Sequence, residues 1–322
     1  MKQKRNLSFD LLKGFLIILV ITDHILPGKA DEGLRGDIYY FHMPLFLAIT
    51  GYFIKTKNLE QKSTTLLIKY KSRLLTPYII AFVAYTLCNF YFYVGINKLQ
   101  TKDIISSVIY PFYHLWYIPA VLIFIFYTKF IYISNKFVFI TFVASAIVSI
   151  TWYAYGDYLT NTIPLLKYIG DKRFYYYYSF FLMGYMLGNC TITSMKPWVS
   201  LAICIIAILL NSFIDQSPLF GAILWYLFNI SLINLTINIC KKPLTINANI
   251  ITKLGETSLP VYLWHVAIII LVTRLTDNNS SFYYIEVIFL TIALIAFSIL
   301  SKNKCKLLDK YYYGEPTQAD NK

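Results

Sequence analysis

Residues 9–24 read FDLLKGFLIILVITDH, an apolar run with the character of a membrane-crossing helix that nevertheless contains Asp10, Lys13, Asp23 and His24. A charged side chain at mid-membrane costs roughly 2.5–3.5 kcal/mol on insertion scales. Polar groups in such a helix are therefore expected to face the interior of a helical bundle or a wet cavity, and not the lipid.

Helical geometry places most of these polar groups on one face. Lys13 and His24 are eleven residues apart in the sequence, which corresponds to three turns plus about 20° and to about 16 Å of rise. Asp10 lies one turn before Lys13 on the same face, whereas Asp23 points away from it. We predict a stripe of Asp10, Lys13 and His24 with an Asp10–Lys13 ion pair. A purely structural ion pair with a histidine at the membrane interface fits the same spacing.

The composition extends the membrane interpretation to the whole chain. Of 322 residues, 57% are hydrophobic and only 14% are charged, against about 25% charged in a typical soluble domain. The net charge of +13 is explained by lysine and arginine in cytoplasmic loops, where they meet anionic lipid. We therefore expect membrane lipid as a partner and no nucleic acid. The five cysteines have irregular spacing and are expected to be free thiols.

The chain is predicted to be an all-α, polytopic transmembrane bundle of about ten helices. Most loop lysines and arginines fall on one side of this topology, which places both termini in the cytoplasm of a multi-pass cell-membrane protein. We expect one domain over residues 1–301 and a short cytoplasmic polar tail over residues 302–322. The predicted spans lie near residues 8–27, 39–55, 74–95, 114–133, 137–154, 174–190, 197–213, 218–239, 257–274 and 282–301.

The four histidines of the chain have a suggestive distribution among these spans. In the predicted topology His24, His42 and His114 fall at the outer ends of helices at a similar depth, and His265 lies nearer mid-membrane. An imidazole can accept and return a proton near neutral pH. The histidines are therefore predicted to line a reaction cavity. No carboxylate stands at ligand spacing beside them, so we expect no metal.

Five segments, in order, resemble the acyltransferase family 3 membrane proteins, and most of all the branch that is fucose 4-O-acetylase-like. The segments are FDLLKGFLIILVITDH, FHMPLFLAITGYFIK, KYKSRLLTPYIIAF, HLWYIPAVLI and SLPVYLWH. The resemblance implies an O-acyltransferase that moves an acyl group, usually acetyl from acetyl-CoA in the cytoplasm, to a carbohydrate hydroxyl at or beyond the outer membrane face. A glycan, a polysaccharide or a lipid-linked sugar is the implied acceptor.

The resemblance also implies roles for particular residues. Lys13 and His24 match a family pattern of a basic residue, ten residues and a histidine, and Asp23 stands where this branch commonly has glycine. His24 is expected to be the general base for the hydroxyl or to carry the acyl group itself. Lys13, paired with Asp10, is expected to steady the acyl donor or a developing negative charge.

Two further groups of residues are expected to bind the substrates. The first group is predicted to bind substrate, with the aromatic pair offering a stacking surface and a hydroxyl to the sugar or to pantetheine; its members are His42, His114, Trp116, Tyr117 and His265. On the CoA side they are Arg73, Lys71 and Lys69, with Arg73 matching the basic residue that precedes LLTPY in the family. Each group has a simpler explanation, because aromatic residues also form interfacial belts and basic residues also anchor cytoplasmic helix ends.

A transporter or flippase of lipid-linked sugar is the alternative function. Such a protein would also have many spans and a polar stripe. It would further be expected to contain an internal repeat with matching broken helices, and the sequence has no clear repeat.

Overall fold

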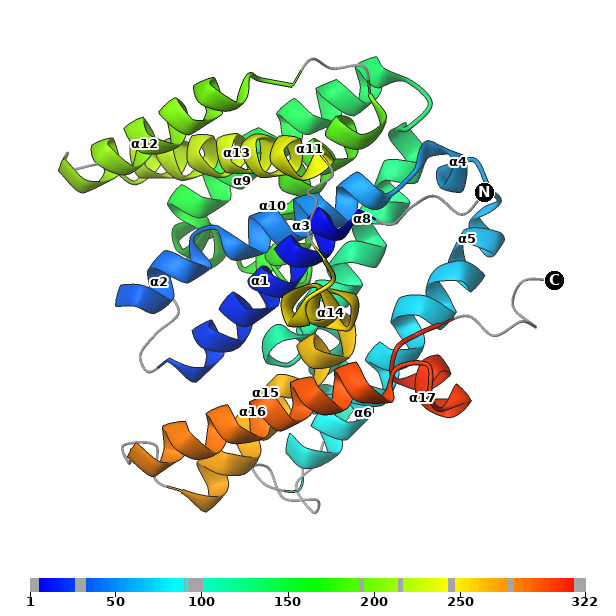
Figure 1. Ribbon diagram of the computed structural model, residues 1–322. Helices are drawn as coiled ribbons and strands as arrows, with labels where there is room; N and C mark the ends of the chain where they lie inside the picture. Colours follow the sequence, from blue (N-terminus) through cyan, green and yellow to red (C-terminus); the bar gives the residue numbers. More distant parts are fainter. Residues whose placement is uncertain are drawn as a thin grey trace. The chain divides into compact units, whose positions relative to one another are not determined.

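The structure is a computed structural model that describes residues 6–26, 33–89, 91, 101–190, 194–213, 217–242, 247–276 and 281–315. Every regular element in these ranges is helical, which confirms the all-α prediction. The chain divides into two compact units, unit 1 (Met1–Tyr39, Ser63–Ile118 and Pro243–Lys322) and unit 2 (Tyr40–Lys62 and Pro119–Lys242). The helices carry the labels shown in Figure 1.

Unit 1 is assembled from three separate stretches of the chain. A five-residue π-helix at Lys71–Leu75 and a 3-10 turn at Tyr113–Trp116 interrupt its α-helices. The α-helices of this unit are α1 (Leu7–Ile25), α2 (Gly33–Tyr39), α5 (Ser63–Tyr70), α6 (Thr76–Asn89), α7 (Thr101–Ile109), α14 (Ile250–Glu256), α15 (Ser258–Leu275), α16 (Ser281–Ser301) and α17 (Lys306–Tyr311).

Unit 2 contains the remaining helices, with α8 beginning at the boundary between the units. A 3-10 turn at Pro164–Tyr168 follows its longest helix. Its α-helices are α3 (His42–Phe53), α4 (Thr56–Leu59), α8 (Tyr117–Ile131), α9 (Asn135–Thr162), α10 (Arg173–Tyr176), α11 (Tyr178–Asn189), α12 (Pro197–Phe213) and α13 (Pro218–Lys241).

The helix α1 is fixed at its start and along its buried face. The Asn6 side chain accepts a hydrogen bond from the Ser8 backbone N–H at 3.0 Å and caps the helix. Further along, α1 crosses α14 at two glycines. A Cβ at Gly14 would lie 2.0 Å from the Ile251 carbonyl oxygen, and one at Gly255 would lie 1.8 Å from the Asp10 carbonyl oxygen. Only glycine at both positions lets the two backbones approach this closely.

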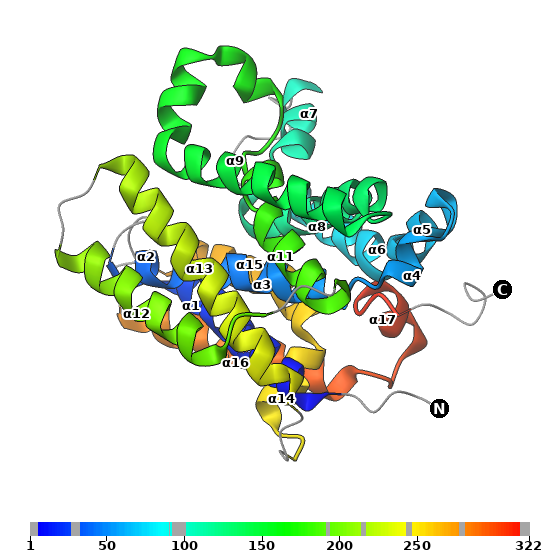
Figure 2. The same ribbon diagram turned by 90° about the horizontal axis from the view of Figure 1, so that it is seen from above.

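In unit 2 the two shortest predicted spans pack against each other. The helices α3 and α11 have 12 residues each, about 18 Å of length. They meet where Gly184 faces the Ala48 carbonyl oxygen and Gly51 faces the Phe181 carbonyl oxygen. Gly184 and Gly188 form a G-x-x-x-G pattern of the kind that brings membrane helices together. In the same unit α12 and α13 lie side by side, as both views show (Figure 1, Figure 2).

Within the described residues, five helices are long and apolar enough to cross a membrane, so the predicted count of about ten spans is not confirmed. Two reasons are visible. The helices α3, α6, α11 and α12 are shorter than a full span, and α1 contains Asp10, Lys13 and Asp23. The five long apolar helices are His114–Ile131, Asn135–Thr162, Pro218–Lys241, Ser258–Leu275 and Phe282–Ser301.

The segment after Ser301 is more structured than the predicted polar tail. It forms α17 and folds back on the end of α16, where the Tyr313 hydroxyl donates to the Ser298 carbonyl at 2.6 Å. Gly314 then reaches the π-helix, since a Cβ there would lie 2.2 Å from the Arg73 carbonyl oxygen. Residues 316–322 of the predicted tail, and the basic residues at the start of the chain, lie outside the described residues.

Candidate active site

Three of the four histidines come together in unit 1. The ring centroids of His114 and His265 are 4.8 Å apart, and the His24 ring lies 5.2 Å from His265 and 5.9 Å from His114. They come from the end of α1, the 3-10 turn before α8, and the middle of α15. We call these three rings the imidazole cluster. The depth estimate from the sequence had set His265 apart from the other histidines, whereas the structure places it inside the cluster.

Backbone carbonyls of α15 hold two of the rings. His114 Nε2 lies 3.2 Å from the Leu263 carbonyl oxygen, and His265 Nδ1 lies 2.8 Å from that of Tyr262 and 3.1 Å from that of Val261. Both side chains are buried, with 3% of His114 and none of His265 exposed. The orientation of each ring is therefore set by one turn of main chain.

Tyrosines surround the imidazole cluster and connect its elements. The Tyr262 hydroxyl donates to the His114 carbonyl, and the Tyr85 hydroxyl donates to the Leu263 carbonyl at 3.1 Å. Tyr117 packs against Tyr262 with ring centroids 5.4 Å apart, and Trp116 lies against Tyr117 at 6.2 Å. The predicted pair Trp116 and Tyr117 is thus buried beside the cluster.

The predicted ion pair of α1 is present near the other end of that helix. Lys13 Nζ lies 2.8 Å from Asp10 Oδ1, as expected for charges three residues apart on a helix. The Asp10 side chain is 4% exposed and that of Lys13 is 25% exposed. Asp10 is buried because α14 crosses α1 at this point, with Gly255 against the Asp10 backbone.

The predicted CoA-binding residues lie at the start of the third predicted span. Lys69 ends α5, and Lys71 and Arg73 belong to the π-helix, a rare conformation that often marks functional sites. Partial burial and the neighbouring Arg73 charge lower the pKa of the Lys69 ammonium. Lys69 and Arg73 are four residues apart, which places the two cations about one helical turn from each other.

These observations agree with a family match that covers nearly all of the chain. Residues 6–302 match the family model of acyltransferase 3, described as an acyltransferase domain. The chain belongs to the acyltransferase 3 family. The family resemblance drawn from the five sequence segments is confirmed, and the fucose 4-O-acetylase-like branch stays a prediction.

Two curated proteins are similar in sequence to this acyltransferase 3 protein over part of its length. Nodulation protein NolL of Mesorhizobium japonicum is 29% identical over 197 residues, covering 58% of this chain and 48% of that protein. Nodulation protein NolL of Sinorhizobium fredii is 28% identical over 196 residues, covering 58% and 49%. The chain spans about half the length of these curated relatives. No solved structure matches it.

The carboxylate next to His24 has a partner that sequence reasoning missed. Arg35 Nε lies 3.3 Å from Asp23 Oδ1, and the Asp23 side chain is 3% exposed. Arg35 comes from α2, which packs against α1 in the same unit. A buried aspartate needs a cation or hydrogen-bond donors, so the unusual Asp23 was itself the signal that a basic partner should be sought.

The fourth histidine, His42, belongs to unit 2 and is a predicted substrate-binding residue. It starts α3 and is buried, and its predicted depth relative to the other histidines stays a prediction.

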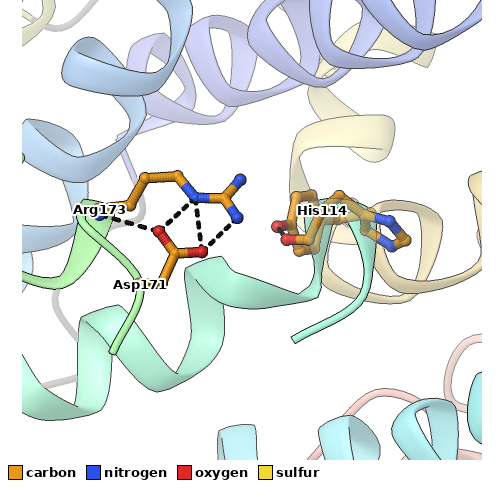
Figure 3. A network of polar contacts seen from close by, with 4 residues as sticks. His114, Asp171 and Arg173 are labelled. Carbon is orange, nitrogen blue, oxygen red and sulfur yellow. Dashed lines mark hydrogen bonds and ion pairs between the residues drawn. The ribbon is translucent and has the colours of Figure 1, made fainter. Parts of the chain in front are cut away.

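Unit 2 also contains a forked ion pair between Asp171 and Arg173, which the sequence analysis did not single out. Arg173 Nε donates to both Asp171 carboxylate oxygens at 2.8 and 2.9 Å (Figure 3, which also draws His114 of unit 1).

In the part of the chain that the structure describes, no group of three or more histidine, cysteine, aspartate or glutamate side chains is arranged to hold a metal ion. The site offers acid–base and hydrogen-bonding chemistry from the imidazole cluster, an ion pair on α1 with a buried carboxylate, and a basic patch of Lys69, Lys71 and Arg73.

Proposed function

We propose that this protein is a membrane O-acyltransferase that transfers an acyl group, most simply acetyl from acetyl-CoA, to a hydroxyl of a carbohydrate. The acceptor is a glycan, a polysaccharide or a lipid-linked sugar. The acyl-CoA binds from the cytoplasm, where both chain termini lie. The family match supports the acyl-transfer chemistry, and the five long apolar helices support a multi-pass membrane location.

The observation that carries the proposal is the imidazole cluster, in which His114 and His265 are buried and His24 is partly exposed. A hydroxyl is a weak nucleophile unless a base removes its proton during attack. A His24 ring nitrogen takes this proton as the hydroxyl oxygen attacks the thioester carbonyl. The C–S bond then breaks, and the proton passes to the departing CoA thiolate. In the covalent variant His24 first takes the acyl group, releasing CoA, and the hydroxyl then attacks the acyl-imidazole.

The ion pair of α1 has a supporting role in this mechanism. Lys13 lies toward the cytoplasmic end of the helix that carries His24, and the distance between them along the axis is about 16 Å. Its ammonium steadies negative charge on the acyl donor, and Asp10, 2.8 Å away, holds it in place.

The basic patch is the proposed site for the phosphates of CoA. Arg73, Lys69 and Lys71 are exposed cationic side chains within a five-residue stretch of helix, and arginine in particular binds phosphate through paired hydrogen bonds. The four-residue spacing of Lys69 and Arg73 supports this assignment, because it places the two cations about one turn apart, where a single anion can contact both.

A radiolabel assay tests the proposed function. Membranes containing the protein are given ¹⁴C-acetyl-CoA, and alkali-labile label is measured in the carbohydrate fraction. We expect His24→Ala to abolish incorporation while the protein still inserts into membranes. Ile18→Ala is the matched control, since Ile18 is 38% exposed on the same helix, and it should leave incorporation unchanged.

Two outcomes would contradict the proposal. Normal incorporation by His24→Ala would remove the assignment of His24. Absence of label from the carbohydrate fraction with wild-type protein, together with movement of a separately supplied radiolabelled lipid-linked sugar across the membrane, would favour the transporter alternative.

A further inference from the structure

The hydrogen bonds of His114 and His265 determine which ring nitrogen carries the proton in each. A carbonyl oxygen only accepts hydrogen bonds, so the nitrogen that faces it must donate. His114 Nε2 faces the Leu263 carbonyl at 3.2 Å. His265 Nδ1 faces the carbonyls of Tyr262 and Val261 at 2.8 and 3.1 Å. The two rings therefore have opposite tautomers.

The second nitrogen of each ring is left as an acceptor. His114 Nδ1 and His265 Nε2 are both buried and meet no hydrogen-bond donor among the described residues. No ion pair in the described part of the chain joins either ring to a carboxylate, and a buried imidazolium without a counter-ion is costly. Both rings are thus neutral, and their two lone pairs cannot satisfy each other.

The imidazole cluster has fewer available N–H donors than acceptor nitrogens. Three neutral imidazoles carry three N–H groups and three bare nitrogens. The N–H groups of His114 and His265 are already directed to backbone carbonyls. A neutral His24 has one N–H, which cannot serve both acceptor nitrogens. The cluster therefore has an excess of acceptors and is complementary to a ligand rich in hydroxyl groups.

We infer that His114 Nδ1 and His265 Nε2 bind the acceptor alcohol by accepting hydrogen bonds from hydroxyls next to the one presented to His24. This inference rests on the proposed function and assigns the imidazole cluster to the sugar. A thioester has no hydrogen-bond donor, so the acyl donor gains nothing from these nitrogens. The matching ligand has at least three hydroxyls on neighbouring carbons, as a pyranose ring does.

The geometry also explains why the two acceptors are held firmly. The carbonyls that fix both rings belong to consecutive residues of α15, Val261 to Leu263. The Tyr262 hydroxyl bonds the His114 carbonyl, which ties the 3-10 turn to the same stretch of helix. Preorganised acceptors of this kind discriminate strongly, because a ligand without the matching hydroxyl leaves buried polar atoms unpaired.

Replacement of each of these two histidines by glutamine or by asparagine tests the inference. The terminal oxygen of glutamine can occupy the position of a histidine Nε2, whereas that of asparagine reaches only the position of Nδ1. His265→Gln should keep transfer within about tenfold of wild type and His265→Asn should lose about a hundredfold. At His114 the order should reverse, with His114→Asn active and His114→Gln impaired. Each position thus serves as the control for the other.

The losses should appear as a larger half-saturating amount of the membrane glycan fraction, with the KM for acetyl-CoA unchanged. Equal losses for both amides at both positions would overturn the inference, as would a change confined to the KM for acetyl-CoA. If His24→Ala is inactive while the amide pattern fails, the proposed function survives and only the roles of His114 and His265 fall.

A second measurement needs no enzymatic activity. In ¹⁵N-histidine-labelled protein in lipid nanodiscs, the ¹⁵N shifts report which ring nitrogen is protonated. At neutral pH we expect His265 protonated on Nδ1 and His114 protonated on Nε2, both neutral. The opposite tautomer or an imidazolium at either position would overturn the inference.

Discussion

At Gly255, where α14 crosses α1, the addition of a single methyl group should have a large effect on stability and on acyl transfer. A Cβ there would lie 1.8 Å from the Asp10 carbonyl oxygen, whereas ordinary contact begins near 3.4 Å. The obstacle is a backbone atom inside a helix, so no side-chain rotation removes it. Gly255→Ala therefore requires α14 to move away from α1 by more than an ångström.

Two opposing terms set the magnitude for Gly255→Ala. Alanine favours a helix over glycine by about 1 kcal/mol, and overpacking costs roughly 1–3 kcal/mol. We expect a net destabilisation of about 1–2 kcal/mol, seen as a Tm lower by a few degrees. The effect on catalysis should be larger, because the shift displaces Asp10 and Lys13. A misplacement of about 1 Å can reduce a rate about a hundredfold.

The assay measures acetyl incorporation and thermal unfolding of the purified protein in parallel. Gly156→Ala is the matched control, since its Cβ would meet only the Trp152 side chain, at 2.9 Å. That variant should unfold at or above the wild-type temperature and transfer normally. A Gly255→Ala protein with wild-type Tm and wild-type transfer would refute the close crossing of α1 and α14 and the reasoning built on it.

Three further predictions follow from the charged residues. Lys13→Ala should reduce transfer severely and Lys13→Arg much less, because arginine keeps the charge beside Asp10; equal losses in the radiolabel assay would contradict this. Arg73→Ala should raise the KM for acetyl-CoA about tenfold or more and leave the glycan half-saturation unchanged, with the exposed Lys136→Ala as control. Arg35→Ala should lower the Tm by leaving a buried carboxylate unpaired, at a cost of about 3–5 kcal/mol. Adding Asp23→Asn should recover part of that loss, and a double variant no more stable than Arg35→Ala would count against the pair.

The parts of the site that the sequence predicted are those governed by spacing within one helix. The Asp10–Lys13 ion pair and the helical character of residues 9–24 follow from a rise and a rotation per residue that hardly vary. The all-α fold follows from composition, because a charge content this low leaves helices as the main way to satisfy the backbone in lipid. Family membership followed from the order of the segments.

The parts that the sequence could not predict depend on contacts between helices. Sequence spacing does not show that the rings of His24 and His265 lie 5.2 Å apart in unit 1, because the two residues come from helices far apart in the chain. The Arg35–Asp23 ion pair could not be predicted either, since nothing in a linear pattern pairs Arg35 with a residue twelve positions earlier.

The predicted count of about ten spans is not confirmed for a related reason. A hydropathy profile identifies an apolar segment, but it does not show whether lipid or other helices surround that segment. The helices α3 and α11 are apolar because they bury each other, and each is only 12 residues long. The pattern G-x-x-x-G at Gly184 and Gly188 was a usable signal for that pairing, and it predicts packing and not a lipid-facing surface.

The dependence of two histidines on the carbonyls of Val261, Tyr262 and Leu263 has an evolutionary consequence. Any amino acid that keeps the helical turn supplies the same carbonyl, so selection on this function constrains the main chain at Val261 and Leu263 more than their side chains, whereas the Tyr262 side chain is also held by its own hydrogen bond to the His114 carbonyl. Alignments of homologous chains would then highlight the imidazoles and pass over the main chain that orients them. Insertions and deletions within this turn, and not substitutions, are the changes that evolution should avoid.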